Sequence, residues 1–295
     1  MAINPDYAPT AEVRDLSFHP VDPHRARTLP EEDVARFNRD GFVSPLPVFS
    51  PAEIDPIRSY IDDLLRAVMS APDRRNSYSV NTYHVVCAGL YDLIGTPSIL
   101  DYVEDIVGPD IVCWGTHLFA KQPHDGMEVP LHQDAIYWPL TPTKSVTVWL
   151  AIDDADEDNA AMQFVPGSHR LGALPHEDRE LDGTRVLKRQ AVDPDQYGER
   201  FSNVLRAGEV SLHSDMLLHG SRPNLSSRRR AGLTLRYAAA EVRTVAGMEW
   251  WTKPSVHCRG NIADHWRHWR RPEGEHPEKM ASFTGEFDGN PPDAS

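Results

Sequence analysis

The stretch LHQDAIYWPL, residues 131–140, places an imidazole and a carboxylate in an otherwise apolar and aromatic run. His132 and Asp134 stand two residues apart, so on an extended strand both side chains point to the same side. Two such groups on one side can share a metal ion. The chain contains 14 histidines, however, and a single His-x-Asp pair also arises by chance. A metal site would need a third ligand from another strand, distant in the sequence.

His219, in the stretch DMLLHGSRPN, is the candidate for that third ligand. It ends an apolar run and precedes a Gly-Ser turn, where a side chain can face the mouth of a pocket. Two histidines and one carboxylate form the ligand set of non-heme Fe(II) oxygenases, which leaves positions open for other ligands. A second His-x-Asp pair, His213 and Asp215, is expected on the same strand and turn as His219. Three ligands from one short strand cannot easily surround an ion, so this pair is interpreted as structural.

The N-terminal third of the chain predicts three helices. The first begins near residue 30, and Gly41 is placed to end it. Ser50 and Glu53 have the spacing of a capping box at the start of the second helix. Thr96 is placed to cap the third helix, and Gly108 to end it. These helices are expected to form a layer that supports the rest of the fold.

From about residue 111 the apolar pattern alternates with a period of two, which predicts strands. The runs span residues 110–122, 145–152, 161–169, 208–220 and 231–242. Helices followed by many short strands predict a mainly β protein with flanking helices, a double-stranded β-helix (jelly roll, cupin-like) core on an N-terminal helical layer. The acidic run 153–160 is expected to be a solvated connection. Residues 171–205 are long and polar for a connection and are a candidate lid.

Both ends of the chain are rich in proline and polar residues. We expect residues 1–29 to be an extended arm, 30–270 a single domain, and 271–295 a flexible tail. No run approaches the roughly 18 apolar residues of a membrane helix, and no signal peptide is evident. Three cysteines without C-x-x-C spacing fit a cytoplasmic protein. The net charge of −14 argues against nucleic acid as the main partner.

Taken together in order, these segments resemble the phytanoyl-CoA dioxygenase (PhyH) superfamily of Fe(II)- and 2-oxoglutarate-dependent oxygenases. The resemblance runs from about residue 30 to 240 and includes FNRDGFV, VPLHQDAIYWPL, GEVSLHSDMLLHGSRPN and RRAGLTLRY. It implies that His132, Asp134 and His219 are the catalytic iron ligands. It also implies oxidation of a C–H bond by O2, with release of succinate and CO2. Because related halogenases have a small residue where Asp134 stands, the resemblance implies a hydroxylase and not a halogenase.

The same resemblance assigns the cosubstrate pocket. It places an arginine about eleven residues after the distal histidine, and Arg230 stands at that position. A planar guanidinium can bind the far carboxylate of 2-oxoglutarate through two hydrogen bonds, which a lysine cannot do. Arg228 has the same strand parity and is the second choice. The other positions that match the cosubstrate pocket of relatives are Ser221, Gln133 and Trp149.

Substrate contacts are expected from residues near the metal motif and from the segment before the strands. The candidates are Tyr137, Trp138, Asn81, Tyr83 and His84, and plain packing is the alternative for each. No basic cluster specific for coenzyme A is evident, which favours a small metabolite or a natural-product intermediate of secondary metabolism. A CoA- or carrier-bound substrate and a non-oxygenase, metal-binding cupin-like protein remain alternative interpretations.

Overall fold

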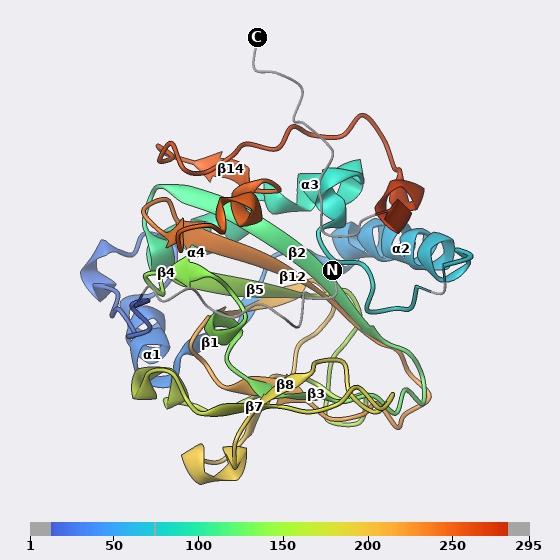
Figure 1. Ribbon diagram of the computed structural model, residues 1–295, viewed down its shortest axis with the longest axis horizontal. Coiled ribbons are helices and arrows are strands. Elements are labelled where there is room, and N and C mark those ends of the chain that lie inside the picture. The colour runs from blue at the N-terminus through green and yellow to red at the C-terminus, as the bar shows by residue number, and fades with distance from the viewer. Residues whose placement is uncertain (1–12, 74, 283–295) are drawn as a thin grey trace.

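The computed structural model describes residues 13–73 and 75–282 of the chain (Figure 1). Its largest sheet is antiparallel and has the strand order β1-β10-β5-β12-β2-β14. These strands span, in that order, Phe42–Pro47, Glu209–Ser214, Ser145–Ala151, Arg230–Ala239, Ile111–Lys121 and Val256–Arg259. The second sheet has the order β3-β11-β6-β9, with Val129–His132, His219–Ser221, Gln163–Phe164 and Phe201–Ser202. Two facing antiparallel sheets give the expected jelly-roll core.

Two short antiparallel strand pairs complete the β structure of the described residues. Strands β4 (Leu140–Thr141) and β13 (Arg243–Thr244) pair beside the large sheet. Strands β7 (His176–Asp178) and β8 (Arg189–Ala191) pair within the long polar segment that was the candidate lid. In Figure 1, β7 and β8 lie beside β3, on the side of the molecule away from α2 and α3. This hairpin therefore stands next to the strand that carries His132.

Helices cover one face of the large sheet, as Figure 1 shows for α2 and α3. The described residues form the α-helices α1 (Glu31–Asp40), α2 (Pro51–Met69), α3 (Ala88–Ile94) and α4 (Pro97–Val107). Gly41 ends α1 with a φ of 89°, and the predicted capping box of Ser50 and Glu53 is present at α2. Thr96 differs from expectation, because its hydroxyl accepts no hydrogen bond from the N–H groups of the helix that follows and instead donates to the Leu93 carbonyl. The predicted helical layer is confirmed.

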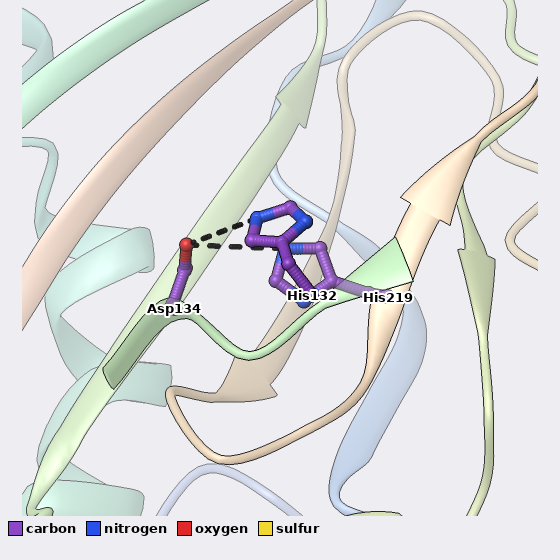
Figure 2. A group of neighbouring side chains, drawn as sticks. All are labelled: His132, Asp134 and His219. Atoms are coloured by element: carbon purple, nitrogen blue, oxygen red, sulfur yellow. Dashed lines mark ion pairs between the residues drawn. The ribbon is translucent and has the colours of Figure 1, made fainter. Parts of the chain in front are cut away.

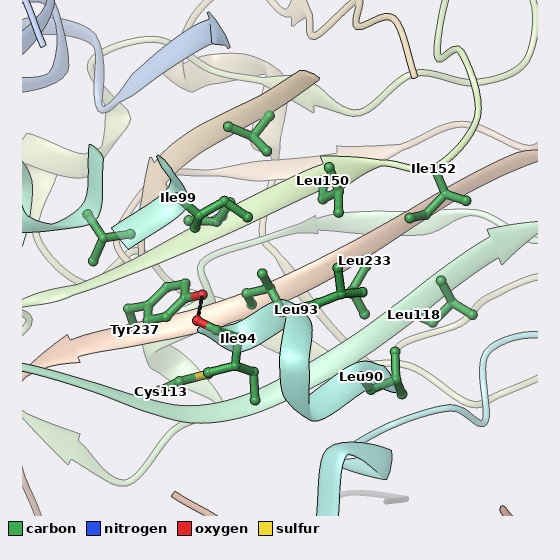
Figure 3. Packing of buried hydrophobic residues seen from close by; sticks show 14 of the residues in the cluster. Leu90, Leu93, Ile94, Ile99, Cys113, Leu118, Leu150, Ile152, Leu233 and Tyr237 are labelled. Atoms are coloured by element: carbon green, nitrogen blue, oxygen red, sulfur yellow. Dashed lines mark hydrogen bonds between the residues drawn. The ribbon is translucent and has the colours of Figure 1, made fainter. Parts of the chain in front are cut away.

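Strand alternation divides the large sheet into an apolar face and a cavity face. On β12 the odd-numbered residues from Ala231 to Tyr237 pack into the main hydrophobic core beneath the helices (Figure 3). The Tyr237 hydroxyl donates to the Ile94 carbonyl at 2.9 Å, which ties this face to α3. The even-numbered residues of β12 point to the other side, toward the second sheet. Side chains on that face can meet those of β3 and β11.

The predicted strand over residues 208–220 is interrupted. Its first part, β10, belongs to the large sheet, and its last part, β11, belongs to the second sheet. A turn between them is held by Ser214, whose N–H donates to the Gly41 carbonyl, and by the Leu217 N–H, which donates to the Ser214 carbonyl. His213 and His219 therefore lie on facing sheets and not on one strand, which the apolar pattern alone did not show.

The two ends of the described chain pack against the domain. The Asp105 carboxylate accepts hydrogen bonds from the backbone N–H groups of residues 27–29. In contrast to the expected flexible tail, Arg271 pairs with Asp92 at 2.6 Å, and the Tyr60 hydroxyl donates to Glu275. The rest of the predicted tail, residues 283–295, lies outside the described residues. Within the described ranges, no helix is both long and apolar enough to cross a bilayer.

Candidate active site

His132, Asp134 and His219 converge between the two sheets (Figure 2). The register of β3 and β11 places His132 directly opposite His219, so their rings contact each other with centroids 4.3 Å apart and planes tilted by 47°. Strand β3 ends at His132, and Asp134 opens the 3-10 turn Asp134–Ile136. One potential ligand atom from each residue lies within 4.8 Å of the other two. The three residues predicted from the sequence are therefore brought together at one point.

Hydrogen bonds orient both imidazoles toward the carboxylate. The Nδ1 of His132 lies 2.8 Å from the Pro130 carbonyl, and the Nδ1 of His219 lies 2.9 Å from the Leu217 carbonyl. A ring that donates from Nδ1 keeps the lone pair on Nε2 free to bind a metal. The Nε2 atoms lie 3.5 Å (His132) and 4.0 Å (His219) from Asp134 Oδ1. The donor set of two imidazole nitrogens and one carboxylate oxygen fits Fe(II).

The charges at this point are those that a metal site requires. Burial, together with the neighbouring His132, lowers the pKa of His219 to about 4, so this imidazole is neutral at neutral pH. Burial acts to raise the pKa of Asp134, but the contact with His132 and the nearby His219 and Arg236 outweigh it and lower that pKa. The Thr147 hydroxyl donates to Asp134 Oδ2 at 3.1 Å. The result is an ionised carboxylate beside a neutral His219 imidazole.

A cavity of about 1250 Å³ opens beside these three residues. It is larger than the roughly 300–1,000 Å³ of a usual ligand pocket, so it has room for a cosubstrate and a substrate together. Arg230 is 2% exposed, and its Nη2 donates to Ser221 Oγ at 3.0 Å. Trp149 lies beside the guanidinium, with its ring centroid 5.6 Å from Arg230 Cζ. The predicted cosubstrate residues Arg230, Ser221 and Trp149 all line this cavity.

Two sequence candidates do not line the cavity. The Gln133 side chain is fully buried and is held by backbone groups, since it donates to Gly172 and Met216 and accepts from Leu174. Gln133 stands between His132 and Asp134, so strand alternation turns it to the opposite side. The His84 ring is likewise buried, within hydrogen-bond distance of the Thr116 hydroxyl and the Pro254 carbonyl. Both residues position the surrounding backbone.

The remaining substrate candidates line the cavity. Tyr137, Trp138, Asn81 and Tyr83 all contribute to its wall. The Tyr137 hydroxyl donates to the Arg189 carbonyl, which connects the wall to β8. Residues 178, 180, 181, 183 and 185–189 of the candidate lid contribute to the same wall. Part of the long polar segment thus forms one wall of the cavity.

Two functional candidates were missed in the sequence. His213 was interpreted as structural, yet its ring lies 4.6 Å from the His219 ring and its Nε2 lies 3.9 Å from Asp134 Oδ2. Neither of its ring nitrogens has a hydrogen-bond partner among the described residues. Arg236 also lines the cavity. The signal for Arg236 was available, because it stands six residues after Arg230 and therefore on the same face of β12.

A jelly roll with two histidines and a carboxylate between its sheets, beside a cavity with a buried arginine, defines the class of non-heme metal jelly-roll proteins. The family model of phytanoyl-CoA dioxygenase (PhyH) matches residues 37–232. The chain belongs to this family.

Individual relatives agree with this assignment. The apo structure of the non-heme monooxygenase ThoJ is 30% identical, with a TM-score of 0.70 over 84% of this chain and 90% of ThoJ. Peroxisomal phytanoyl-CoA dioxygenase of Bos taurus is 32% identical over 149 residues, 49% of this chain and 44% of that enzyme. A probable alpha-ketoglutarate-dependent hypophosphite dioxygenase of Stutzerimonas stutzeri is 31% identical over 173 residues, 57% of this chain and 59% of that enzyme. The chain thus spans about half the length of these curated relatives.

Proposed function

We propose that this protein is an Fe(II)- and 2-oxoglutarate-dependent dioxygenase that hydroxylates, or otherwise oxidises, a C–H bond of a small metabolite or natural-product intermediate. The observation that carries the proposal is one cavity wall that holds both a His-Asp-His group and a buried arginine without a carboxylate partner among the described residues. A simple metal-binding protein has no need for the second feature. Family membership supports the same reaction class.

Each residue has a defined task in this proposal. His132, Asp134 and His219 hold Fe(II), and Arg230 with Ser221 binds the far carboxylate of 2-oxoglutarate. With iron and 2-oxoglutarate bound, such a site activates O2 for insertion into a C–H bond and releases succinate and CO2. Trp149 packs beside the cosubstrate and excludes water from its carboxylate contact. The carboxylate of Asp134 occupies the position at which a halide would bind, which favours hydroxylation.

The organisation of the chain and its surroundings is proposed on the same basis. We treat residues 30–270 as one catalytic domain, with the cavity-lining residues 178, 180, 181, 183 and 185–189 as the cover of its substrate side. Three free cysteines, of which Cys87 and Cys113 are buried, fit a reducing cytoplasm. A small molecule and not a nucleic acid is the expected partner, because the protein carries a net charge of −14.

The test is cosubstrate binding under anaerobic conditions. Adding Fe(II) and 2-oxoglutarate should produce a weak visible charge-transfer band and raise the melting temperature, and adding O2 should form succinate. His132→Ala should lose the band. Arg228→Gln is a matched control, because Arg228 lies at the surface and pairs with Asp156 at 2.7 Å. Metal binding without any effect of 2-oxoglutarate would instead support a non-oxygenase, metal-binding cupin-like protein.

Turnover separates the remaining alternatives. Free small molecules should stimulate succinate formation above the background rate. If 2-oxoglutarate binds but no free small molecule stimulates turnover, while a CoA or carrier thioester does, the substrate is a carrier-bound acyl group.

A further inference from the structure

Six lysine and arginine side chains line the cavity, namely Arg75, Arg185, Lys188, Arg189, Arg230 and Arg236. Four of them lie within 4.0 Å of a carboxylate: Arg75 with Asp73, Arg185 with Glu128, and both Lys188 and Arg189 with Asp178. Among the described residues, Arg230 and Arg236 have no such partner. The proposed function supplies an anion for Arg230, which is 2-oxoglutarate. Arg236 remains without one.

Aromatic rings hold the Arg236 guanidinium in place. Its Cζ lies 5.4 Å from the ring centroid of Trp114 and 5.4 Å from that of Trp138. The two tryptophans contact each other edge to face, with centroids 4.5 Å apart. The two ring centroids are closer to each other than to Arg236 Cζ, so both rings lie on one side of the guanidinium and restrict the rotamers of the arginine there. The side chain is therefore preorganised.

Two N–H donors in this cluster have no acceptor in the described part of the chain. They are Arg236 Nε and the indole Nε1 of Trp114, whose side chain is 4% exposed. Both residues line the cavity. Buried donors without partners are uncommon in folded proteins and point to a missing acceptor. A ligand with two acceptor oxygens would satisfy both.

Asp134 does not fill this role. The basic atoms within 4.0 Å of its carboxylate are those of His132, His213 and His219, and Arg236 is not among them. A metal held by Asp134 would neutralise part of the charge of that carboxylate, so Asp134 would not serve as the counter-ion of the guanidinium. Arginine stays protonated in proteins, so its charge persists in the cavity.

We propose that Arg236 and the Trp114 indole N–H together bind a carboxylate of the substrate. A planar guanidinium binds a planar carboxylate through two parallel hydrogen bonds, and the indole N–H adds a third. Flanking tryptophans would pack against the carbon atoms next to that carboxylate. The inference rests on the proposed function for what happens to the substrate, but the binding event itself does not require turnover.

The arrangement along β12 separates substrate from cosubstrate. Arg230 and Arg236 are six residues apart, roughly 20 Å along the strand. Ser221, at the Arg230 end, is on β11, whereas Arg236 pairs in register with Thr147, which contacts Asp134. The two carboxylate sites thus lie at opposite ends of one cavity face. The substrate would be held by its carboxylate, with its carbon chain extending toward the metal group.

The experiment measures the preference for a carboxylate over the matched neutral amide. The probes are three pairs: propionate and propionamide, benzoate and benzamide, and phenylacetate and phenylacetamide. Binding to the anaerobic protein with Fe(II) and saturating 2-oxoglutarate is followed by calorimetry and by tryptophan fluorescence, since Trp114 and Trp138 flank the site. The wild type should bind at least one acid about tenfold to a hundredfold more tightly than its amide.

Three variants locate that preference. Arg236→Gln should reduce it to less than about twofold while the 2-oxoglutarate affinity stays unchanged. Trp114→Phe keeps the ring but removes the N–H, and should reduce the preference about fivefold. Arg228→Gln should leave it unchanged. An Arg236→Gln protein that keeps the preference would overturn the proposal, and so would a wild type that shows none in any pair up to the solubility limit.

If the proposed oxygenase function is wrong, the binding measurements give a result that differs from failure of the Arg236 site. The preference is also measured in Arg230→Gln without Fe(II) or 2-oxoglutarate, where the cosubstrate site cannot capture the probe. A protein that ignores 2-oxoglutarate but discriminates acids from amides through Arg236 would contradict the oxygenase assignment and support this site. Tighter binding of propylphosphonate than of any carboxylate would overturn the choice of carboxylate.

Discussion

Arg230→Gln is the substitution that most directly tests the cosubstrate site. The guanidinium donates from Nε to the Ala160 carbonyl at 3.1 Å and from Nη2 to Ser221 Oγ at 3.0 Å, and it has no carboxylate partner among the described residues. Glutamine keeps a polar group of similar reach but removes the positive charge and the paired N–H donors. The variant therefore asks whether this charge is what binds 2-oxoglutarate.

The magnitude follows from the number of charged hydrogen bonds that are lost. Each contributes about 1.5–3 kcal/mol, so a paired contact is worth roughly 3–6 kcal/mol, which corresponds to about a hundredfold to ten-thousandfold weaker 2-oxoglutarate binding. Burial lowers the pKa of Arg230 to about 10. Keeping the buried side chain charged without an anion therefore costs the folded protein roughly 3 kcal/mol. The variant avoids this cost, so its cosubstrate-free form should melt at an unchanged or higher temperature.

Thermal unfolding with and without 2-oxoglutarate is the assay. At a concentration of one hundred times Kd, the ligand should stabilise the wild type by about 2.7 kcal/mol, a rise of about 5–10 °C in Tm. Arg230→Gln should show almost no rise at that concentration, and Arg228→Gln should behave as wild type. The reasoning is refuted if Arg230→Gln keeps its 2-oxoglutarate affinity within about threefold of the wild type.

Four further substitutions test other parts of the site and fold. Asp134→Ala should abolish hydroxylation and weaken Fe(II) binding, whereas His213→Ala should keep the metal; an Fe(II) titration with the opposite result would contradict the ligand assignment. Gly232→Ala would place a Cβ 1.9 Å from the Trp149 ring, so urea unfolding should show a loss of about 1–3 kcal/mol together with weaker 2-oxoglutarate binding. Burial lowers the pKa of His84 to about 4, so the unfolded chain binds this proton first and stability falls as pH drops from 6.5 toward 4. Between pH 7 and pH 4.5, the free energy of unfolding in urea should therefore fall by about 2–3 kcal/mol less in His84→Gln than in the wild type. An equal fall in both proteins would exclude His84 as the source of the pH dependence.

The sequence predicts correctly those helices and strands whose ends are determined by residues nearby in the chain. The capping box of Ser50 and Glu53 forms at α2, with the Ser50 N–H donating to Glu53 at 2.8 Å. The long strands β2 and β5 coincide with their predicted runs to within one residue at each end, and β12 to within three, because alternation persists over their whole length. The distance from His132 to His219 was also informative, since only a strand from elsewhere can complete the ligand group.

Features of the fold that depend on contacts between distant residues could not be predicted from the sequence. The run 208–220 predicts one strand and a turn, with Asp215 as the turn-former, but nothing in its pattern shows that the residues on the two sides of Asp215 belong to different sheets. The hydrogen bond from the Ser214 N–H to the Gly41 carbonyl, which fixes that turn, joins positions far apart in the sequence. His213 was therefore assigned to the wrong surroundings. Gln133 was misplaced for a simpler reason, because alternation beside His132 already predicted that it points away from the cavity.

Arg236 is a residue whose position the sequence predicts but whose surroundings only the structure shows. Its parity with Arg230 was visible, but parity alone does not separate a ligand-binding arginine from one that is neutralised within the protein. That distinction depends on the neighbours that other strands supply, and here these are Trp114 from β2 and Trp138 from the turn after the metal motif. Neither carries a charge. The four other lysine and arginine side chains of this cavity do have carboxylate partners. The lack of such a partner at Arg236 is therefore not a general property of the cavity wall. The chain has more acidic than basic residues, yet among the described residues Arg230 and Arg236 have no carboxylate partner in this cavity. The cavity is therefore suited to binding two anionic groups, one on the cosubstrate and one on the substrate.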